Sequence, residues 1–110
     1  MAYDEGLATL LRDDLAETPG IVEKRMFGGL AFMKDGHMLC GVHKDGGMFR
    51  VGKPNEAAAL AIQGVTPMAF TGRPMGGLVD ADDEAMADDD TRVRLMALAL
   101  DNVAGLPPKT

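Results

Sequence analysis

Both histidines and the only cysteine of the chain stand at regular spacing, as His37-x-x-Cys40-x-x-His43. Imidazole and thiolate are ligands that zinc prefers, so this spacing raises the question of a metal site. The surrounding residues predict a strand, however, in which successive side chains alternate between the two faces. Cys40 would then point away from both histidines, which would lie ~20 Å apart at ~3.3 Å per residue. Because no further Cys or His can complete a four-ligand site, we expect neither a metal nor a cofactor.

Side chains suited to nucleophilic or acid–base catalysis are few. The sequence contains no serine, which excludes a Ser-His-Asp triad. Cys40 stands in an apolar run, where a thiol is expected to be packed and unreactive, although pairing with a histidine stays formally open. Carboxylates are concentrated at residues 80–84 and 88–90, and their density indicates solvated surface rather than a pocket that would shift their pKa. We therefore expect no enzymatic activity.

Arginines beside paired glycines are the remaining candidates for a binding site. Residues 25–29 read Arg-Met-Phe-Gly-Gly, and residues 72–77 read Gly-Arg-Pro-Met-Gly-Gly. Glycine permits a positive φ and close approach of another group, while guanidinium groups and backbone amides bind anions. If Arg25, Arg50 and Arg73 converge, they would form an anion-binding notch; alternatively, each pairs with an aspartate of this chain. The candidate binding residues are Arg25, Phe27, Gly28, Gly29, Arg50, Arg73, Pro74 and Gly76.

An amphipathic helix followed by a strand meander is expected to position these residues. Four leucines between residues 7 and 15 follow the spacing of one helical face, and Asp4 is a suitable N-cap. The Thr-Pro-Gly sequence at 18–20 would end the helix. Apolar runs separated by glycine-containing turns then predict an antiparallel meander with one face available to helices. The expected strands are residues 21–27, 30–33, 37–42 and 48–51.

The second half of the chain predicts a helix, two strands and a final helix. Pro54 suits the first turn of the alanine-rich helix, and Gly64 suits its end. The aspartates at 88–90 favour a helix start, since negative charge stabilises the amino end of a helix. The expected elements are a helix at 54–62, strands at 68–70 and 78–79, a solvated linker or frayed turn at 80–84, and a helix from 88 to 104. The fold class is therefore α+β, a two-layer sandwich in the order α-β(meander)-α-β-β-α.

Length and charge limit the class of function. The 110 residues suffice for one domain, 1–110, with no apolar stretch long enough to cross a membrane. The acidic N-terminus and the single cysteine predict a cytoplasmic protein. The net charge of −6 opposes direct nucleic-acid binding, although residues 21–79 carry seven bases against four acids. The methionines beyond Met1 are interpreted as core filler, with an adaptable binding surface as the alternative.

The two arginine–glycine motifs, together with Leu-Pro-Pro-Lys at 106–109, resemble those of the TfoX N-terminal domain family. The resemblance covers nearly the whole chain and implies an antiparallel sheet with helices packed on it. In the competence regulator after which the family is named, this domain is joined to a second domain that acts with it in transcription. We find no counterpart of that second domain and expect a stand-alone member.

The resemblance also implies a non-enzymatic regulatory module that engages a protein partner, with the transcription machinery as one class of partner. We expect one sheet face or edge to be used, with Arg25 and Arg73 near the glycine turns. The alternative is a small domain that binds an anionic ligand through Arg25, Arg50 and Arg73. A homodimer through an exposed sheet edge or a methionine-rich face stays open.

Overall fold

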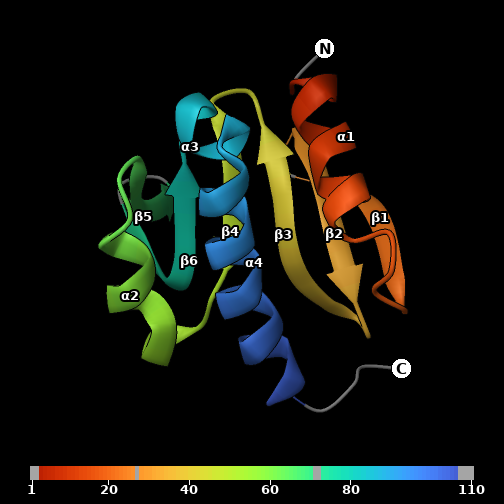
Figure 1. Cartoon of the computed structure of the whole chain (residues 1–110). Helices are drawn as coiled ribbons and strands as arrows, with labels where there is room; N and C mark the ends of the chain where they lie inside the picture. The colour runs from red at the N-terminus through yellow and green to blue at the C-terminus, as the bar shows by residue number, and fades with distance from the viewer. Residues whose placement is uncertain (1–2, 27, 71–72, 107–110) are drawn as a thin grey trace.

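A computed structural model of the chain describes residues 3–26, 28–70 and 73–106, with backbone alone at 26, 69–70 and 73–75. Figure 1 shows the elements and the colour order along the chain. The elements are α1 (Glu5–Asp14), β1 (Ile21–Met26), β2 (Gly29–Lys34), β3 (His37–His43), β4 (Gly46–Arg50), the short 3-10 helix η1 (Lys53–Asn55), α2 (Glu56–Leu60), β5 (Val65–Phe70), β6 (Arg73–Ala81), α3 (Asp83–Ala87) and α4 (Asp89–Ala104).

The strands within the described residues form one six-stranded antiparallel sheet in the order β1-β2-β3-β4-β6-β5. The first four strands are the expected meander, and the β5–β6 hairpin extends the sheet by pairing β6 with β4. The register places Phe32 opposite Cys40, Cys40 opposite Phe49, and Phe49 opposite Val79. These fully buried side chains make a continuous apolar row across four strands.

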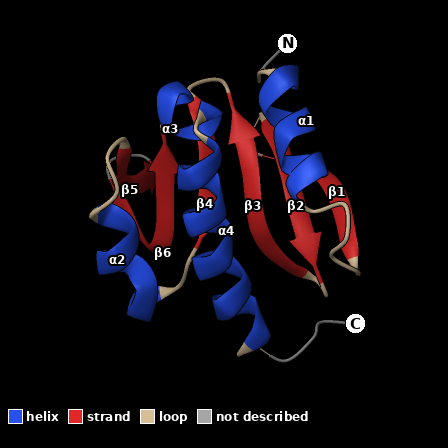
Figure 2. Cartoon of the chain, viewed as in Figure 1, coloured by secondary structure: helices blue, strands red, loops and turns tan. Residues whose placement is uncertain are grey.

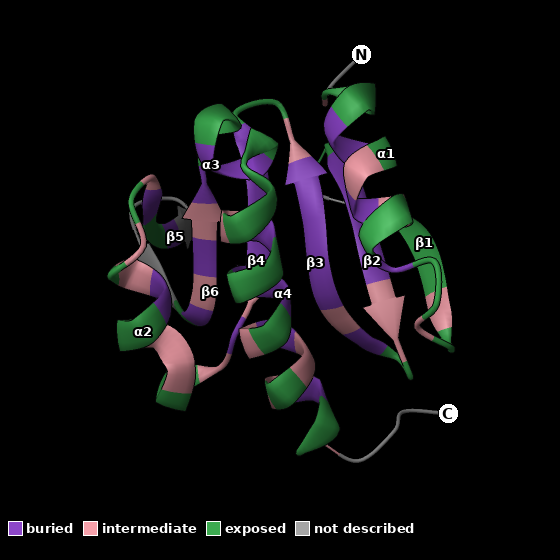
Figure 3. Ribbon diagram, viewed as in Figure 1, coloured by how far each residue is buried: buried purple, intermediate pink, exposed green. Residues whose placement is uncertain are grey.

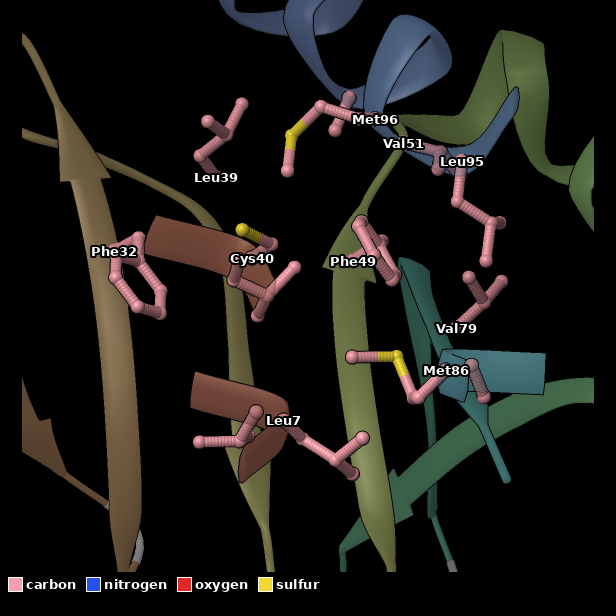
Figure 4. Packing of buried hydrophobic residues seen from close by; sticks show 14 of the residues in the cluster. Leu7, Phe32, Leu39, Cys40, Phe49, Val51, Val79, Met86, Leu95 and Met96 are labelled. Atoms are coloured by element: carbon pink, nitrogen blue, oxygen red, sulfur yellow. The ribbon is translucent and has the colours of Figure 1, made fainter. Parts of the chain in front are cut away.

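All four α-helices lie on one face of the sheet, as Figure 2 shows. The core between the layers contains Leu11 of α1, Leu95 of α4, and the row of sheet residues that faces them. Figure 4 shows Cys40 between Phe32 and Phe49 in this core. Figure 3 shows the resulting pattern, with buried central strands and exposed outer helix surfaces. The expected α+β sandwich is therefore confirmed, because the two periodicities of the sequence bury matching faces.

The N-cap expected at Asp4 is present, since its carboxylate accepts the N–H groups of Gly6 and Leu7. The expectation for residues 80–84 is wrong. Instead of forming a solvated linker, they complete β6 and begin α3. Asp82 caps α3 by accepting the Ala85 N–H at 2.8 Å, and the helix buries Ala85 and Met86 in the core. A five-residue helix is too short to show a periodic pattern, so the density of carboxylates concealed it.

The helices are joined by Arg92 of α4, which is only 4% exposed. Its guanidinium donates to the Asp14 carboxylate of α1 at 2.8 Å, the Asp89 carboxylate at 2.6 Å and the Met86 carbonyl at 2.8 Å. A buried charge is tolerated only when it is paired and hydrogen-bonded in this way. Arg92 therefore holds α1, α3 and α4 in one arrangement. No helix among the described residues has the length and apolar character needed to cross a membrane.

Candidate functional site

Arg25 and Arg50, two of the arginines expected to converge, lie on opposite faces of the sheet. Arg25 of β1 is exposed and stands opposite Leu30, which faces the helices. Arg50 ends β4 and follows Phe49, a core residue, so its side chain projects from the other face. Their strands are three positions apart in the sheet, or ~14 Å at ~4.8 Å per strand. The structure therefore does not bring these two guanidinium groups together.

Within the described part of the chain, neither Arg25 nor Arg50 forms an ion pair with an aspartate or glutamate. The backbone of Arg73 and Pro74 begins β6, where these residues stand opposite Phe70 and Ala69. Their side chains, and Phe27 as a whole, lie outside the described residues. The prediction that Arg73 and Phe27 contribute to binding therefore stays a prediction.

The first glycine pair is explained by packing of the backbone. Gly29 begins β2 so close to β3 that a Cβ atom would overlap the carbonyl oxygen of Val42. Gly28 precedes it with φ +72°, in the left-handed region that favours glycine, and a Cβ there would meet no other atom. Within this motif, Gly29 is therefore the residue that the contact between β2 and β3 requires.

The second glycine pair forms a seam between β6 and the segment that leads into α2. Gly77 has φ +83°, and a Cβ atom on it would lie 3.1 Å from the Cα of Gly52. Its carbonyl accepts the N–H groups of Val51 and Gly52, and its own N–H donates to the Glu56 carboxylate at 2.7 Å. Gly76 is exposed and lies beside the Lys53 side chain. The backbone amide of Gly77 is therefore already used within the fold.

A different surface carries none of the described helices: the sheet face opposite them, which we call the open face. Alternation from Phe32, Phe49 and Val79 in the core determines which side chains project from it. No helix of the described chain packs on this face (Figure 2). The residues of the open face are Val22, Lys24, Ala31, Met33, Met38, Gly41, His43, Met48, Arg50, Thr66, Leu78 and Asp80.

The centre of the open face is apolar and closed to solvent, since Ala31 is 0% exposed and Gly41 is buried. Ala31 and Gly41 stand side by side on β2 and β3, and Met48 of β4 lies across the glycine, with its methyl group 2.7 Å from where a Cβ would be. Met48 is 1% exposed. Met33 and Met38, which are half-buried, continue the apolar surface towards one end. Two of the expected core methionines therefore lie partly exposed on this face, whereas Met86 and Met96 fill the core between the layers.

The rim of the open face carries an exposed hydrophobic side chain and two cations. Val22 on the edge strand β1 is 62% exposed. Lys24 follows it on the same face, and Arg50 lies beside Leu78 on the far side of the methionines. The other charged groups assigned to this face, His43 and Asp80, are paired with each other. The open face is thus locally basic in a chain with a net charge of −6.

His43 and Asp80 form a hydrogen-bonded pair that spans β4. Nε2 of His43 lies 2.9 Å from the Asp80 carboxylate, and Nδ1 accepts the Asp45 N–H at 3.1 Å. The Asp80 carboxylate raises the pKa of His43, and the Asp45 charge acts in the same direction while burial opposes them. Because both ring nitrogens are engaged, the imidazole is not free to take a proton from a substrate in this arrangement.

Two shallow hollows near this pair have volumes of about 220 and 250 Å³, and three of the seven residues that line each are carboxylates. Three of these carboxylates serve the fold: Asp80 binds His43, Asp82 caps α3, and Asp88 caps α4 by accepting from the Thr91 N–H and hydroxyl. Among the described residues, no group of three or more His, Cys, Asp or Glu side chains is arranged to hold a metal ion.

Cys40 and the histidines beside it are separated by the alternation of the strand. Cys40 is fully buried and faces the core, where burial raises the pKa of its thiol. His43 projects from the open face, and His37 is buried at the start of β3. A thiol that is inaccessible and disfavoured as thiolate is poorly suited to nucleophilic attack.

The sequence predicted a sheet face or edge as the binding surface, but it did not indicate which face or which residues. The alternation of Met33 with Phe32 and of Met48 with Phe49 carries the signal, because each methionine must project opposite to a large aromatic residue. The pairing of His43 with Asp80 has no comparable signal, since the two residues are 37 positions apart and their strands are not neighbours.

Comparison with known families places this geometry in context. The model of the TfoX N-terminal domain matches residues 13–103, from the end of α1 to the end of α4. That range contains all the described strands and both glycine motifs. Comparison with curated proteins and with solved structures found no match.

Proposed function

We propose that this chain, which belongs to the TfoX N-terminal domain family, is a non-enzymatic regulatory module that binds a protein partner on its open face. The observation that carries this proposal is the sheet with helices on one face and, on the other, the half-buried Met33 and Met38 beside the exposed Val22. Flexible, polarisable methionines suit a surface that adapts to a partner. The cytoplasm is the proposed location, because a single cysteine suits a reducing compartment.

The charges of the open face indicate the chemistry of the partner. Lys24 and Arg50 flank the apolar centre, so a complementary surface would be apolar with carboxylates at its rim. Such a partner would cover Val22, whose exposure is otherwise a cost in water. Nucleic acid is a poorer candidate, because the net charge of −6 repels it and the centre of the face offers apolar contact.

A small anionic ligand bound by Arg25, Arg50 and Arg73 is the second candidate function. The structure does not support such a site, because Arg25 and Arg50 project from opposite faces of the sheet and cannot converge on one ligand. No observation on the described residues favours it, and we do not propose it further. Binding to the transcription machinery is proposed from the family alone and is the part of the function that a capture experiment addresses.

Two valines of nearly equal exposure provide a matched test. Val22 on the open face is 62% exposed, and Val93 on α4 is 64% exposed in the opposite layer. Immobilised wild type, Val22→Glu and Val93→Glu would be used to capture proteins from a lysate of the source organism. We expect specific partners to be lost by Val22→Glu and retained by Val93→Glu, with circular dichroism confirming that both variants fold.

Charge reversal at the rim extends this test. Lys24→Glu and Arg50→Glu should weaken the same partners, because each change places like charges across the interface. A transcription factor or polymerase subunit within this set would support the regulatory role. Identical captured proteins for wild type and all open-face variants would contradict the proposal.

A further inference from the structure

We infer that two copies of this chain associate through the outward side of α4, with the two helices antiparallel about a two-fold axis. The surface concerned lies in the helix layer and is separate from the open face. The inference is therefore independent of the proposed function, and both surfaces could be occupied at once.

The outward side of α4 carries a second apolar stripe besides the one that faces the core. Val93, Ala97, Leu100 and Ala104 follow a spacing of four, three and four residues, which places them along one line of a helix. Val93 is 64% exposed, Ala97 and Ala104 are exposed, and Leu100, at the flank of the helix, is half-buried and also packs against the core. Figure 3 shows the exposed outer surface of this helix. We call these four residues the α4 ridge. The core-facing residues of α4 are Arg92, Leu95, Met96, Ala99 and Val103.

The charges beside the α4 ridge are complementary to themselves. Arg94 and Asp101 are seven residues apart, so they lie on the same side of the ridge, almost two turns from each other. In an antiparallel pair related by a two-fold axis, that side of one helix faces the same side of the other. Arg94 would then face Asp101 of the partner subunit, and the reverse contact would form at the other end. A parallel pair would instead place the flank that carries Arg94 and Asp101 against the opposite flank of the partner helix, so these contacts would not form.

The apolar contacts agree with this register. When Val93 stands opposite Ala104 of the partner subunit, Ala97 stands opposite Leu100 of the partner subunit, so each large side chain meets a small one. Small residues allow the helix axes to approach closely, as ridge-and-groove packing requires. The same register leaves Arg94 and Asp101 of the partner subunit offset by two residues, which is about 3 Å along the axis and within reach of an arginine.

The guanidinium group of Arg94 is not engaged in an ion pair within the described part of the fold. Even Asp90, which stands one turn before it, forms no ion pair with Arg94. Asp101 is exposed and accepts one hydrogen bond, from the Asn55 side chain at 3.1 Å, which leaves its other oxygen available. A single pair of four-turn helices is a small interface, and each copy carries a charge of −6. We therefore expect a weak dimer that depends on protein concentration.

Sedimentation velocity on the full chain, from micromolar to millimolar concentration near physiological salt, tests this inference. Wild type should show a concentration-dependent dimer. Arg94→Asp should raise the dimer dissociation constant by about tenfold or more, because two attractive contacts become repulsive. Adding Asp101→Arg should restore association, since the swapped charges again face each other. Val93→Glu should weaken the dimer, and Val22→Glu, with its matched exposure on the open face, should leave it unchanged.

Folding is checked separately, because Asp101→Arg removes the contact with Asn55. Arg94→Asp and Val93→Glu break no hydrogen bond or ion pair of the described fold and provide the comparison if the double variant is unstable. A wild type that stays monomeric throughout the concentration range would overturn the inference. So would a dimer that Val93→Glu and Arg94→Asp leave intact, or one that Val22→Glu dissolves.

Discussion

The Cα of Gly52 lies only 3.1 Å from the position that a Cβ atom on Gly77 would occupy, so the two glycines pack against each other without side chains. Gly77 belongs to the second arginine–glycine motif, and Gly52 joins β4 to the segment before α2. The contact brings the carbonyl of Gly77 within reach of the N–H groups of Val51 and Gly52. The second motif therefore contains a seam of the fold, and Gly77 needs no ligand to explain it.

The first glycine pair should respond unequally to substitution. Gly29→Ala should destabilise the protein by about 3 kcal/mol or more, because its Cβ would overlap the Val42 carbonyl in the next strand. Gly28→Ala should cost about 1 kcal/mol, since the site is open and only the positive φ is unfavourable. Urea denaturation of both variants measures the difference. Equal effects would mean that the turn conformation, rather than the strand contact, requires the pair.

Substitution of the two aspartates that bind Arg92 should also cause unequal losses of stability. Asp14→Asn should reduce the free energy of unfolding by about 2 kcal/mol, since it leaves a buried guanidinium without its partner on α1. Asp89→Asn should cost below about 1 kcal/mol, because the Asp89 side chain is 83% exposed and water can replace it. Chemical denaturation at neutral pH compares them. A larger loss for Asp89→Asn would show that Arg92 does not act mainly by holding α1 to α4.

His43 should make stability depend on pH in a defined direction. The Asp80 carboxylate raises its pKa in the folded protein above the unfolded value of about 6.5. The folded state therefore binds the proton more tightly, so this stabilisation is complete below the unfolded pKa and is lost as the pH rises through the folded pKa. His43→Gln should consequently cost more stability at about pH 5.5 than at about pH 8.5.

Asp80→Asn is the control for this pH dependence, because it keeps the imidazole and removes the charge that raises its pKa. Thermal unfolding of wild type and both variants across the pH range would measure the effect. His37 is present in all three proteins, so its contribution cancels in the differences. A cost of His43→Gln that is the same at both pH values, or greater at the higher one, would contradict the assigned role.

Cys40 should react with thiol reagents only when the protein opens. It is fully buried between Phe32 and Phe49, and burial raises the pKa of its thiol. We expect labelling of the native protein to be slow and to accelerate in urea in parallel with unfolding. Rapid labelling of the native thiol, with folding intact, would indicate an accessible cysteine and reopen the possibility of thiol chemistry.

Local patterns in the sequence were sufficient to predict most of the elements. The leucine spacing and Asp4 predicted α1 and its cap, and the glycine-containing turns predicted the meander, because these signals depend on neighbours a few residues apart. The pattern failed at 80–84, because α3 is only five residues long and too short to show a helical periodicity. It also shortened β6, since the residues around the second glycine pair carry too few apolar side chains to be read as a strand.

Which face of the sheet each arginine side chain projects from could not be predicted. It depends on the strand order and on the exact register of each strand. Arg25 and Arg50 look equivalent along the chain. Arg25, however, pairs with Leu30 and lies on the same face as the helices, whereas Arg50 follows Phe49 and lies on the opposite face. A shift of one residue in either strand would have reversed the outcome. The open face exists only because all four helices pack on the other side of the sheet, which no single element of the sequence determines.

The sequence by itself determined the family, the α+β class and the capped helices, because these follow from motifs and from periodicities within single elements. Only the tertiary structure decided that Gly29 and Gly77 pack against neighbouring backbone, that Arg92 joins three helices, and that His43 meets Asp80 across β4. Each of these contacts joins residues that are close in space and distant in the chain. Their geometry is set by strand register and by the packing of the two layers, which no short stretch of sequence encodes.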